Sequence, residues 1–263
     1  MKVIYVVLVY RNYEDLKSFI NSLLKFQDNV NNVIVVENFF NTATSKIFED
    51  LCNRYKILDF KSIPNDGYGM GNNFGIDIAK KHNPEYIVVS NPDILVKDFN
   101  LEHIEKLPPS VYGPRIIRKN KTDQNPYWSK KSFLSEWLMY LGEKNNNDFI
   151  RYIGIILTKI YKLTIKHDRI SRVFALHGSF LIFHISVIKT LDRPFDPNIF
   201  LYCEEDDLAY TLASKKIKSF YVPLLKVVHM EDGSAGLLKK STINEFRRKS
   251  AIYRFEKWNN RII

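Results

Sequence analysis

The first hundred residues alternate between short apolar runs and amphipathic segments. The apolar runs cover residues 2–9, 33–36, 57–62 and 86–89, and helical spacing of apolar residues is found over about 14–26, 44–55 and 73–81. A strand that is apolar on both faces must be covered on both faces, as in a parallel sheet, and intervening helices supply that cover. The sequence therefore predicts an α/β fold, a Rossmann-like and mostly parallel sheet flanked by helices.

The rest of the chain divides by pattern into three segments. Residues 174–235 return to the α/β pattern of residues 1–105, with strands expected at 180–183, 199–202 and 219–228 and a helix at 208–215. Residues 106–173 are predicted to form a basic, aromatic helical insertion, and residues 236–263 a basic helical tail.

The net charge of +10 comes from two segments only. Residues 115–172 contain 13 Lys and Arg against 5 Asp and Glu, and residues 239–263 contain 8 against 2, so the remaining chain is mildly acidic. In a helix expected around 149–169, five basic residues share one arc of the helical wheel, opposite a broad apolar side; they are Arg151, Lys159, Lys162, Lys166 and Arg169. This arc is either a solvated surface or a face that lies on an anionic membrane.

Composition narrows the class of protein further. Two cysteines, Cys52 and Cys203, are too few for a disulfide framework or a cysteine-based zinc site, which favours a reducing, cytoplasmic setting. The apolar N-terminal run is interrupted at Tyr10–Asp15 and lacks a small-residue cleavage site, so it is interpreted as a strand and not a signal peptide. No stretch reaches the about 20 apolar residues that span a bilayer, so any membrane contact is expected to be peripheral.

Polar residues follow the predicted strands, where ligands bind in open α/β sheets. Glu37-Asn38 and Asn91-Pro92-Asp93 end two strands, and a glycine-rich turn at 65–73 precedes a helix. The turn lacks the spacing of a Walker or dinucleotide-binding loop, and it is either a phosphate cradle or an ordinary turn. Asp93 is suited to a hard divalent cation, although a turn or helix-capping aspartate has the same sequence context.

Four carboxylates, Glu204 to Asp207, follow the apolar run 199–202. Their mutual repulsion is costly unless a metal, a basic partner or a catalytic task offsets it, and one of them could act as a general base. His229 also ends a predicted strand and could complete a metal site with Asp93, whereas His177, beside Gly178, has a less distinctive context.

Taken in order, these clusters resemble the family 2 glycosyltransferases, inverting nucleotide-sugar enzymes with a GT-A fold. The Asn-Pro-Asp form of the metal motif resembles the branch of rhamnosyl- and galactofuranosyltransferases. The resemblance covers about residues 1–105 and 174–235 and rests on seven stretches: Tyr10-Arg11-Asn12, Val35-Val36-Glu37-Asn38, Asn65-Asp66-Gly67 through Asn73, Asn91-Pro92-Asp93, His177-Gly178-Ser179, Phe200-Leu201-Tyr202-Cys203-Glu204-Glu205 and Val227-Val228-His229.

The resemblance implies a role for each motif. Glu205 would be the catalytic base, with Glu204 or Asp206 able to take its place, and Asp93 and His229 would hold Mg²⁺ or Mn²⁺. Residues 1–105 would bind the donor and residues 174–235 the acceptor. Donor contacts are expected from Tyr10, Asn12, Glu37, Asp66, Gly67, Asn72, Asn73, Asn91 and Asp93, and acceptor contacts from His177, Gly178, Ser179 and Asp206. The chain departs from the family pattern at Glu37 and Glu205, where aspartate is usual.

The function implied is transfer of a sugar, with rhamnose favoured, from a nucleoside-diphosphate sugar to a hydroxyl of a bacterial surface-polysaccharide precursor. The acceptor would be a glycan or lipid-linked glycan, reached by peripheral contact with the anionic inner face of the cell membrane. Two other classes remain open at this point: a nucleotidyltransferase that makes a nucleotide sugar, and a nucleic-acid-binding protein suggested by the basic balance, although no nucleic-acid-binding motif is present. The oligomeric state is not predicted.

Overall fold

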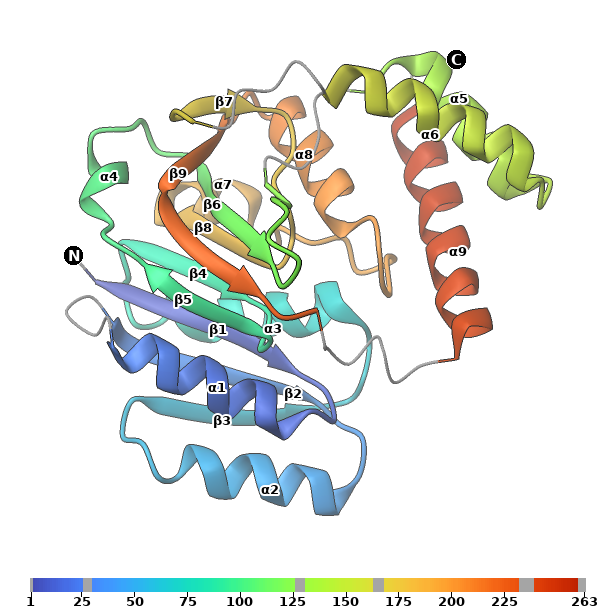
Figure 1. Cartoon of the computed structure of the whole chain (residues 1–263). Helices are drawn as coiled ribbons and strands as arrows, with labels where there is room; N and C mark the ends of the chain where they lie inside the picture. Colours follow the sequence, from blue (N-terminus) through green and yellow to red (C-terminus); the bar gives the residue numbers. More distant parts are fainter. Residues whose placement is uncertain (1, 26–29, 126–130, 163–167, 232–238, 260–263) are drawn as a thin grey trace.

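One mixed sheet runs through the molecule (Figure 1). The computed structural model describes residues 2–25, 30–125, 131–162, 168–231 and 239–259. Within them the strand order is β3-β2-β1-β4-β8-β6-β9-β5, with β7 paired to β9 off this path. The strands are β1 Val3–Val9, β2 Val30–Asn38, β3 Leu58–Ile63, β4 Tyr86–Ser90, β5 Ile94–Asp98, β6 Val111–Arg118, β7 Ser171–Val173, β8 Phe180–His184 and β9 Ser219–His229.

The N-terminal half of the sheet is parallel and covered on both faces. β1 pairs in parallel with β2 and β4, and β2 with β3. Alternate residues of β1 belong to two separate cores: Tyr5 packs with α1 (Tyr13–Leu23) and α2 (Thr42–Cys52), and Val6 with α3 (Tyr68–Lys80). The predicted α/β class, with helices flanking the sheet, is therefore confirmed.

In the second half of the sheet, antiparallel strands bring distant segments to one edge. β8 runs antiparallel to β4 and places Phe180 opposite Ser90, while β5 and β9 place Ile94 opposite His229. The end of β4, the start of β8 and the end of β9 therefore meet at one edge, beyond the carboxyl ends of the parallel strands. The short helices α4 (Glu102–Glu105) and α7 (Ile185–Leu191) complete this half.

Three sequence expectations at this edge are wrong. Residues 199–202 form a loop and not a strand, and α8 (Glu204–Ser214) begins four residues earlier than expected, so all four carboxylates lie in its first turn. The glycine-rich segment is mostly helix, because α3 begins at Tyr68. A methyl group at Gly71 would lie 2.3 Å from Cδ1 of Leu8, so this glycine allows close packing of the helix on the sheet.

The helical insertion is narrower than the 106–173 segment, because β6 is part of the central sheet. Two helices, α5 (Phe133–Lys144) and α6 (Asp148–Lys162), form a hairpin at the side of the molecule away from the parallel strands (Figure 1). The C-terminal helix α9 (Lys240–Asn259) packs against α5, where the rings of Tyr140 and Phe255 stack with centres 4.3 Å apart. Across the described residues, no helix is long and apolar enough to cross a membrane.

Candidate active site

Tyr68 marks the point where the separate motifs meet. Its hydroxyl lies 2.9 Å from the carbonyl oxygen of Gly178 and 3.2 Å from Oδ1 of Asn91. Burial, followed by the negative charges of Glu204 and Glu205, raises the pKa of this hydroxyl well above its usual range. The Asn-Pro-Asp motif, the 177–179 segment and the acidic run thus surround one hydroxyl group. Sequence reasoning missed Tyr68, although it directly follows the motif residue Gly67.

Asp93 and His229 form a buried pair whose facing atoms both accept. Nε2 of His229 lies 3.2 Å from Oδ2 of Asp93, and the two residues are 8% and 5% exposed. On the other side of the ring, Nδ1 lies 2.7 Å from Oε1 of Gln124. Since an amide oxygen only accepts, Nδ1 carries a proton, and in the neutral imidazole the Nε2 lone pair faces the carboxylate. Two acceptors this close call for a cation or a proton between them.

The Gln124 amide is itself fixed in orientation. Its Nε2 donates to Oε1 of Glu231 at 2.9 Å, and the same oxygen lies 3.0 Å from Nε of Arg118. Gln124 therefore orients His229 in the way that a residue hydrogen-bonded to a metal ligand orients that ligand in a metal centre. It lies in the 106–173 segment, where no motif identified it, so no sequence signal was available to find it.

The Asp93–His229 pair fits a divalent cation that takes its remaining ligands from a bound substrate. Oδ1 of Asp93 is buried and has no hydrogen-bond partner among the described residues. No group of three or more histidine, cysteine or acidic residues positioned to hold a metal ion was found in that part of the chain. An oxygen and an imidazole nitrogen are ligands that Mg²⁺ or Mn²⁺ accepts, with water and phosphate oxygens completing the shell.

The end of β2 carries another open carboxylate. Glu37 is fully buried, and neither of its side-chain oxygens has a hydrogen-bond partner within the described ranges. Next to it, Asn38 donates to the carbonyl oxygen of Gly67 at 3.2 Å. Gly67 has φ +96°, and a methyl group there would lie 2.4 Å from the carbonyl oxygen of Phe200, so only glycine suits this position.

Beyond β1, an aromatic and cationic cluster lies next to Asn12. The Tyr10 and Phe40 rings meet edge to face at 5.8 Å, and the Arg11 guanidinium carbon lies 4.2 Å from the centre of the Phe40 ring. Phe40 is 42% exposed, which gives this end of the sheet a surface suited to a planar ring. Asn12 bonds to Asp15 at the start of α1, and Asp66 is exposed. Arg11 lies within the predicted Tyr10–Asn12 motif, whereas Phe40 was not among the predicted site residues.

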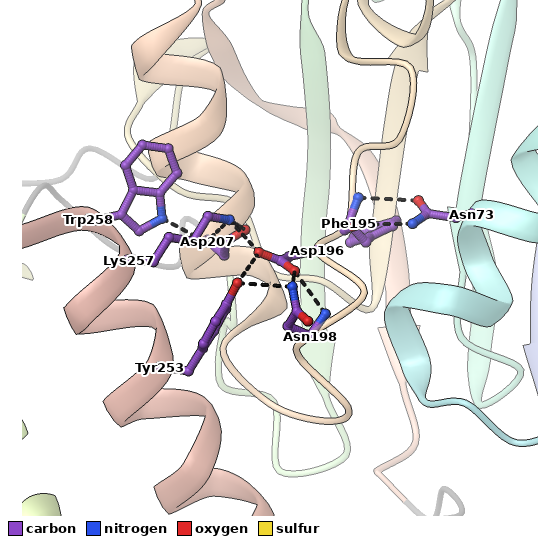
Figure 2. Close-up of polar contacts among 8 residues, drawn as sticks. All are labelled: Asn73, Phe195, Asp196, Asn198, Asp207, Tyr253, Lys257 and Trp258. Atoms are coloured by element: carbon purple, nitrogen blue, oxygen red, sulfur yellow. Dashed lines mark hydrogen bonds and ion pairs between the residues drawn. The ribbon is translucent and has the colours of Figure 1, made fainter. Parts of the chain in front are cut away.

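Asn72 and Asn73 make contacts within the protein. The Asn73 side chain donates to the carbonyl oxygen of Phe195 at 2.7 Å and accepts from its N–H at 3.2 Å (Figure 2). The buried Asn72 side chain donates to the carbonyl oxygen of Tyr68 at 3.0 Å. Sequence analysis expected both in donor binding, but in the structure Asn73 fastens α3 to the loop that leads into the acidic run.

The first two acidic residues of α8 face the site. Glu204 is 6% exposed, and its Oε1 has no hydrogen-bond partner among the described residues. Burial, and then the charge of Glu205, raises the pKa of Glu204 well above its usual range. A methyl group added to Gly178 would lie 3.6 Å from Oε2 of Glu205, which places that carboxylate against the 177–179 segment.

The backbone just before α8 is strained. Tyr202 and Cys203 have φ of 70° and 68°, left-handed values that are unfavourable for side chains other than glycine. Such strain persists where surrounding packing fixes it and is concentrated at functional sites.

The other two acidic residues point away from the site. Oδ2 of Asp206 lies 2.7 Å from Nζ of Lys131. Burial alone would raise the pKa of Asp206, but the charges of Lys131 and Arg254 hold it below its usual range. Asp207 accepts from Lys257 at 2.8 Å and from Nε1 of Trp258 at 2.6 Å (Figure 2). Asp206, expected to contact acceptor or replace the base, is therefore engaged by a basic partner.

The 177–179 segment lies beside the Asp93–His229 pair. The rings of His177 and His229 are 5.7 Å apart, and Nδ1 of His177 lies 2.9 Å from Oγ of the buried Ser179. The backbone N–H of His177 donates to Oδ1 of Asn125 at 2.8 Å. The structure thus brings the predicted acceptor and metal residues together.

Three solved structures share this arrangement of elements. The crystal structure of GalNAc-T7 with UDP, GalNAc and Mn²⁺ has a TM-score of 0.60 and 14% identity over 87% of this chain, which spans less than half (43%) of that protein. The mannosyltransferase PcManGT of Pyrobaculum calidifontis, in complex with GDP-Man and Mn²⁺, has a TM-score of 0.53 and 11% identity, with 90% of this chain and 59% of that one covered. The structure of S. aureus TarS 1–349 has a TM-score of 0.56 and 13% identity, with 99% and 73% covered. At these identities the likeness shows the fold alone, which is the GT-A glycosyltransferase fold.

Sequence comparison identifies the family within that fold. The model described as Glycosyl transferase family 2 matches residues 5–189, and the chain belongs to that family. The rhamnosyltransferase WbbL of Escherichia coli (strain K12) is 27% identical over 235 residues, which cover 86% of this chain and 83% of the relative. The chain is therefore a glycosyltransferase, and the nucleotidyltransferase and nucleic-acid-binding alternatives are set aside.

Proposed function

We propose that this glycosyltransferase moves a sugar, with rhamnose favoured, from a nucleoside-diphosphate sugar to a hydroxyl of a polysaccharide precursor, with inversion at the anomeric carbon. One observation carries the proposal: Glu37, Asp93 and Glu204 each have a buried carboxylate oxygen without a hydrogen-bond partner in the described part of the chain. A buried carboxylate oxygen is costly unless something satisfies it. A donor with its cation and an acceptor hydroxyl would satisfy all three.

Glu37 would accept hydrogen bonds from the base or ribose of the donor. Because Glu37 is fully buried, its carboxylate is suited to accept hydrogen bonds from hydroxyl or N–H groups of the donor. The cluster of Tyr10, Arg11 and Phe40 would lie along the nucleoside. Asn91, held near Tyr68, would contact the diphosphate-sugar part, and Gly67 keeps the start of α3 in place beside it. Asp66 and Asn12 remain candidate donor contacts by resemblance to the family.

Asp93 and His229 would hold the Mg²⁺ or Mn²⁺. The ion, when bound, offsets the charge of the diphosphate and makes it a better leaving group. GalNAc-T7 and PcManGT were crystallised with Mn²⁺, which supports a divalent cation here. His229 would contribute the lone pair of Nε2 and Asp93 its carboxylate, and Gln124 would keep the imidazole of His229 in position.

Glu205 would act as the base that deprotonates the acceptor hydroxyl as it attacks from the face opposite the diphosphate. It borders Gly178 in the proposed acceptor segment, and its neighbour Glu204 has a raised pKa and so holds a proton more readily. Glu205 is less buried than Glu204, and its charge is one cause of the raised pKa of Glu204. Glu204 would therefore keep the proton more readily, which leaves Glu205 to act as the base.

The acceptor is proposed to be a lipid-linked glycan at the cytoplasmic face of the membrane. Similarity to the rhamnosyltransferase WbbL supports rhamnose as the sugar that is transferred. His177, Gly178 and Ser179 border both Glu205 and the Asp93–His229 pair, which is where an attacking hydroxyl would lie.

Thermal-shift measurements against a panel of nucleotide sugars with Mn²⁺ test the donor, because a ligand that binds the folded state raises Tm. Deoxythymidine-diphosphate rhamnose is expected to give the largest rise in Tm. Transfer from this donor should release nucleoside diphosphate, and NMR of the glycan product should show that the configuration at the anomeric carbon of the transferred sugar is inverted. Retention of configuration, or release of pyrophosphate from a nucleoside triphosphate, would overturn the proposal.

Direct Mn²⁺ titration by electron paramagnetic resonance tests the metal pair apart from activity. Asp93→Asn should abolish binding, and Gln124→Ala should weaken it by about 10- to 100-fold, the usual cost of losing an orienting residue. The double variant Gln124→Glu/Glu231→Gln keeps an acceptor toward Nδ1 and, with donor and acceptor exchanged, the bond between residues 124 and 231, and it should restore most of the affinity. Unchanged Mn²⁺ binding in Asp93→Asn would remove this pair from the metal site.

A further inference from the structure

The two basic segments of the sequence differ in where their side chains lie. In the arc expected on α6, Nη2 of Arg151 lies 2.8 Å from Oδ1 of Asp148, and Arg169 lies beyond the end of the helix. Lys166 and the side chain of Lys162 fall outside the described residues. On α9, in contrast, basic side chains reach into the protein, where they contact the segment that carries the proposed base.

Lys257 of α9 connects two buried carboxylates that lie on either side of the proposed base in the sequence. Its Nζ lies 2.6 Å from Oδ2 of Asp196 and 2.8 Å from Oδ1 of Asp207 (Figure 2). The two carboxylate side chains are only 9% and 2% exposed, so water and salt screen these ion pairs little. The same oxygen of Asp196 accepts from the Tyr253 hydroxyl at 3.0 Å. One helix therefore fixes both ends of the segment 196–207.

α9 also holds the middle of this segment. Oγ of Ser250, a residue that is 4% exposed, donates to the carbonyl oxygen of Leu201 at 2.8 Å. The ring of Phe246, one turn earlier on α9, stacks on the ring of Phe200 with centres 4.7 Å apart. Both contacts lie directly before the two residues with left-handed φ, a strained conformation that persists only where its surroundings fix it. Ser250 and Phe246 supply part of that fixation.

The loop formed by residues 195–203 is held on its other side by α3. The backbone N–H of Tyr68 donates to the carbonyl oxygen of Phe200 at 2.8 Å, and the Asn73 side chain bonds to the backbone of Phe195. Figure 2 shows Asn73 on one side of this loop and Lys257 on the other. The loop that leads into the acidic run is therefore held between α3 and the C-terminal helix.

We propose that Ser250 and Lys257 are positioning residues, which hold the 195–203 loop so that Glu205 meets the acceptor hydroxyl. This inference rests on the proposed function. Ser250 acts through the backbone of the loop, and Lys257 acts through the two aspartates. Displacing a reacting group by about 1 Å can slow an enzyme by about 100-fold, so a helix away from the chemistry can control its rate. The family match ends at residue 189, before the loop and α9, so it assigns neither residue a role.

The variant Ser250→Ala tests the proposal with little disturbance of packing, because it removes a hydroxyl group and no carbon atom. The value of kcat should fall by about 10- to 100-fold, because the loop is no longer held at Leu201. The KM for the donor, and the rise of Tm on donor binding, should stay within about twofold of the intact chain, since the lost contact positions the base and does not bind the donor.

Thr158→Val is the matched control for Ser250→Ala. The Thr158 hydroxyl is also buried, and it donates to the carbonyl oxygen of Gly154 at 3.0 Å within α6. Its loss removes the same kind of hydrogen bond in the α5–α6 hairpin. This control should lower Tm to a similar extent and leave kcat unchanged.

Lys257→Met separates positioning from stability. The single variant should be slow even at temperatures where it is fully folded. The double variant Lys257→Met/Asp207→Asn should regain much of the lost stability, because residue 207 no longer carries an unpaired charge. It should not regain kcat, because Asp196 still lacks the lysine that ties the loop to α9.

Amide hydrogen exchange tests the loop without any assay of sugar transfer. Exchange within residues 196–207 should be faster in Ser250→Ala than in the intact chain and unchanged in Thr158→Val. The proposal is overturned if kcat of Ser250→Ala stays within about twofold of the intact chain, if exchange in this segment is unchanged, or if kcat recovers with stability in the double variant. Absence of transfer by the intact protein with every donor would count against the proposed function, and the exchange measurement would still decide whether α9 holds the loop.

Discussion

The two halves of the acidic run at the start of α8 have the same kind of side chain and opposite surroundings. Glu204 and Glu205 face Tyr68 and Gly178, and Glu204 retains an unsatisfied buried oxygen. Asp206 and Asp207, one step further along the same turn, are bound by Lys131, Lys257 and Trp258. The same helical turn thus forms part of the proposed catalytic centre on one side and anchors α9 on the other.

This difference between the two pairs shows that the role of each carboxylate in the run depends on the side chains that pack against it. Charge repulsion within the run requires compensation, and Asp206 and Asp207 receive it from lysine side chains. For the open oxygen of Glu204, we propose that a bound ligand supplies it. The following predictions test this division.

The largest effect is expected at Glu205. Glu205→Gln should lower the rate of transfer by about 1,000-fold, because an amide cannot take the proton of the acceptor hydroxyl. Donor binding, followed by thermal shift, should be nearly unchanged. Near-normal transfer in this variant would move the base to Glu204, and loss of donor binding would show that Glu205 acts in binding and not as a base.

The next effect is expected on the anchoring side. Lys257→Met should destabilise the protein by about 3 kcal/mol, because it leaves the Asp207 carboxylate, which is 2% exposed, without its cation. Chemical denaturation measures this loss. The double variant Lys257→Met/Asp207→Asn should recover a large part of it, and no recovery would mean that the helix contact, and not the charge pair, carries the stability.

Much of the fold was predictable because its signals are local. The strand at β1 and the helices at α1 and α2 follow from runs and spacings within a dozen residues, and each appears in the structure within a few residues of its expected bounds. The start of α3 was not predictable in the same way. Glycines at 69, 71 and 75 disfavour a helix locally, and only their close contact with β1, β2 and the 195–199 loop explains a helix there.

The same distinction between local and long-range signals applies to the residues of the candidate site. Asp93, His229 and Gly178 were identifiable because each lies at or next to the end of a strand in a recognisable motif, and Glu205 because it follows the apolar run 199–202. Gln124 was not, because its role depends on β6 lying beside β9, a pairing between segments a hundred residues apart. The two halves of the acidic run were likewise indistinguishable in sequence, since Lys131 and Lys257 come from distant segments.

A smaller effect, dependent on pH, is expected at Glu204. Its folded-state pKa is raised, so the folded protein holds a proton that the unfolded chain releases, and stability should fall as pH rises from the usual carboxyl pKa toward the raised one. Each unit of pKa difference corresponds to about 1.4 kcal/mol. Glu204→Gln should remove this fall: measured without metal, the variant should be more stable than the parent at pH 8 and nearly equal at pH 4. Equal pH profiles would contradict the burial of an open carboxylate here.

The smallest effect is expected at a second lysine–carboxylate pair on α9. Lys249 and Glu245 lie 2.6 Å apart, the same separation as Lys257 and Asp196, but they are 70% and 59% exposed. The lysine lowers the pKa of Glu245, so any stability from the pair is present above the usual carboxyl pKa and lost as pH falls, yet water and salt screen exposed charges. Glu245→Gln should therefore leave Tm unchanged within error from pH 4 to pH 8, whereas Lys257→Met lowers it at neutral pH. A comparable drop in both variants would show that α9 is held by its own helical stability, and that the anchoring half of the acidic run does not fix its position.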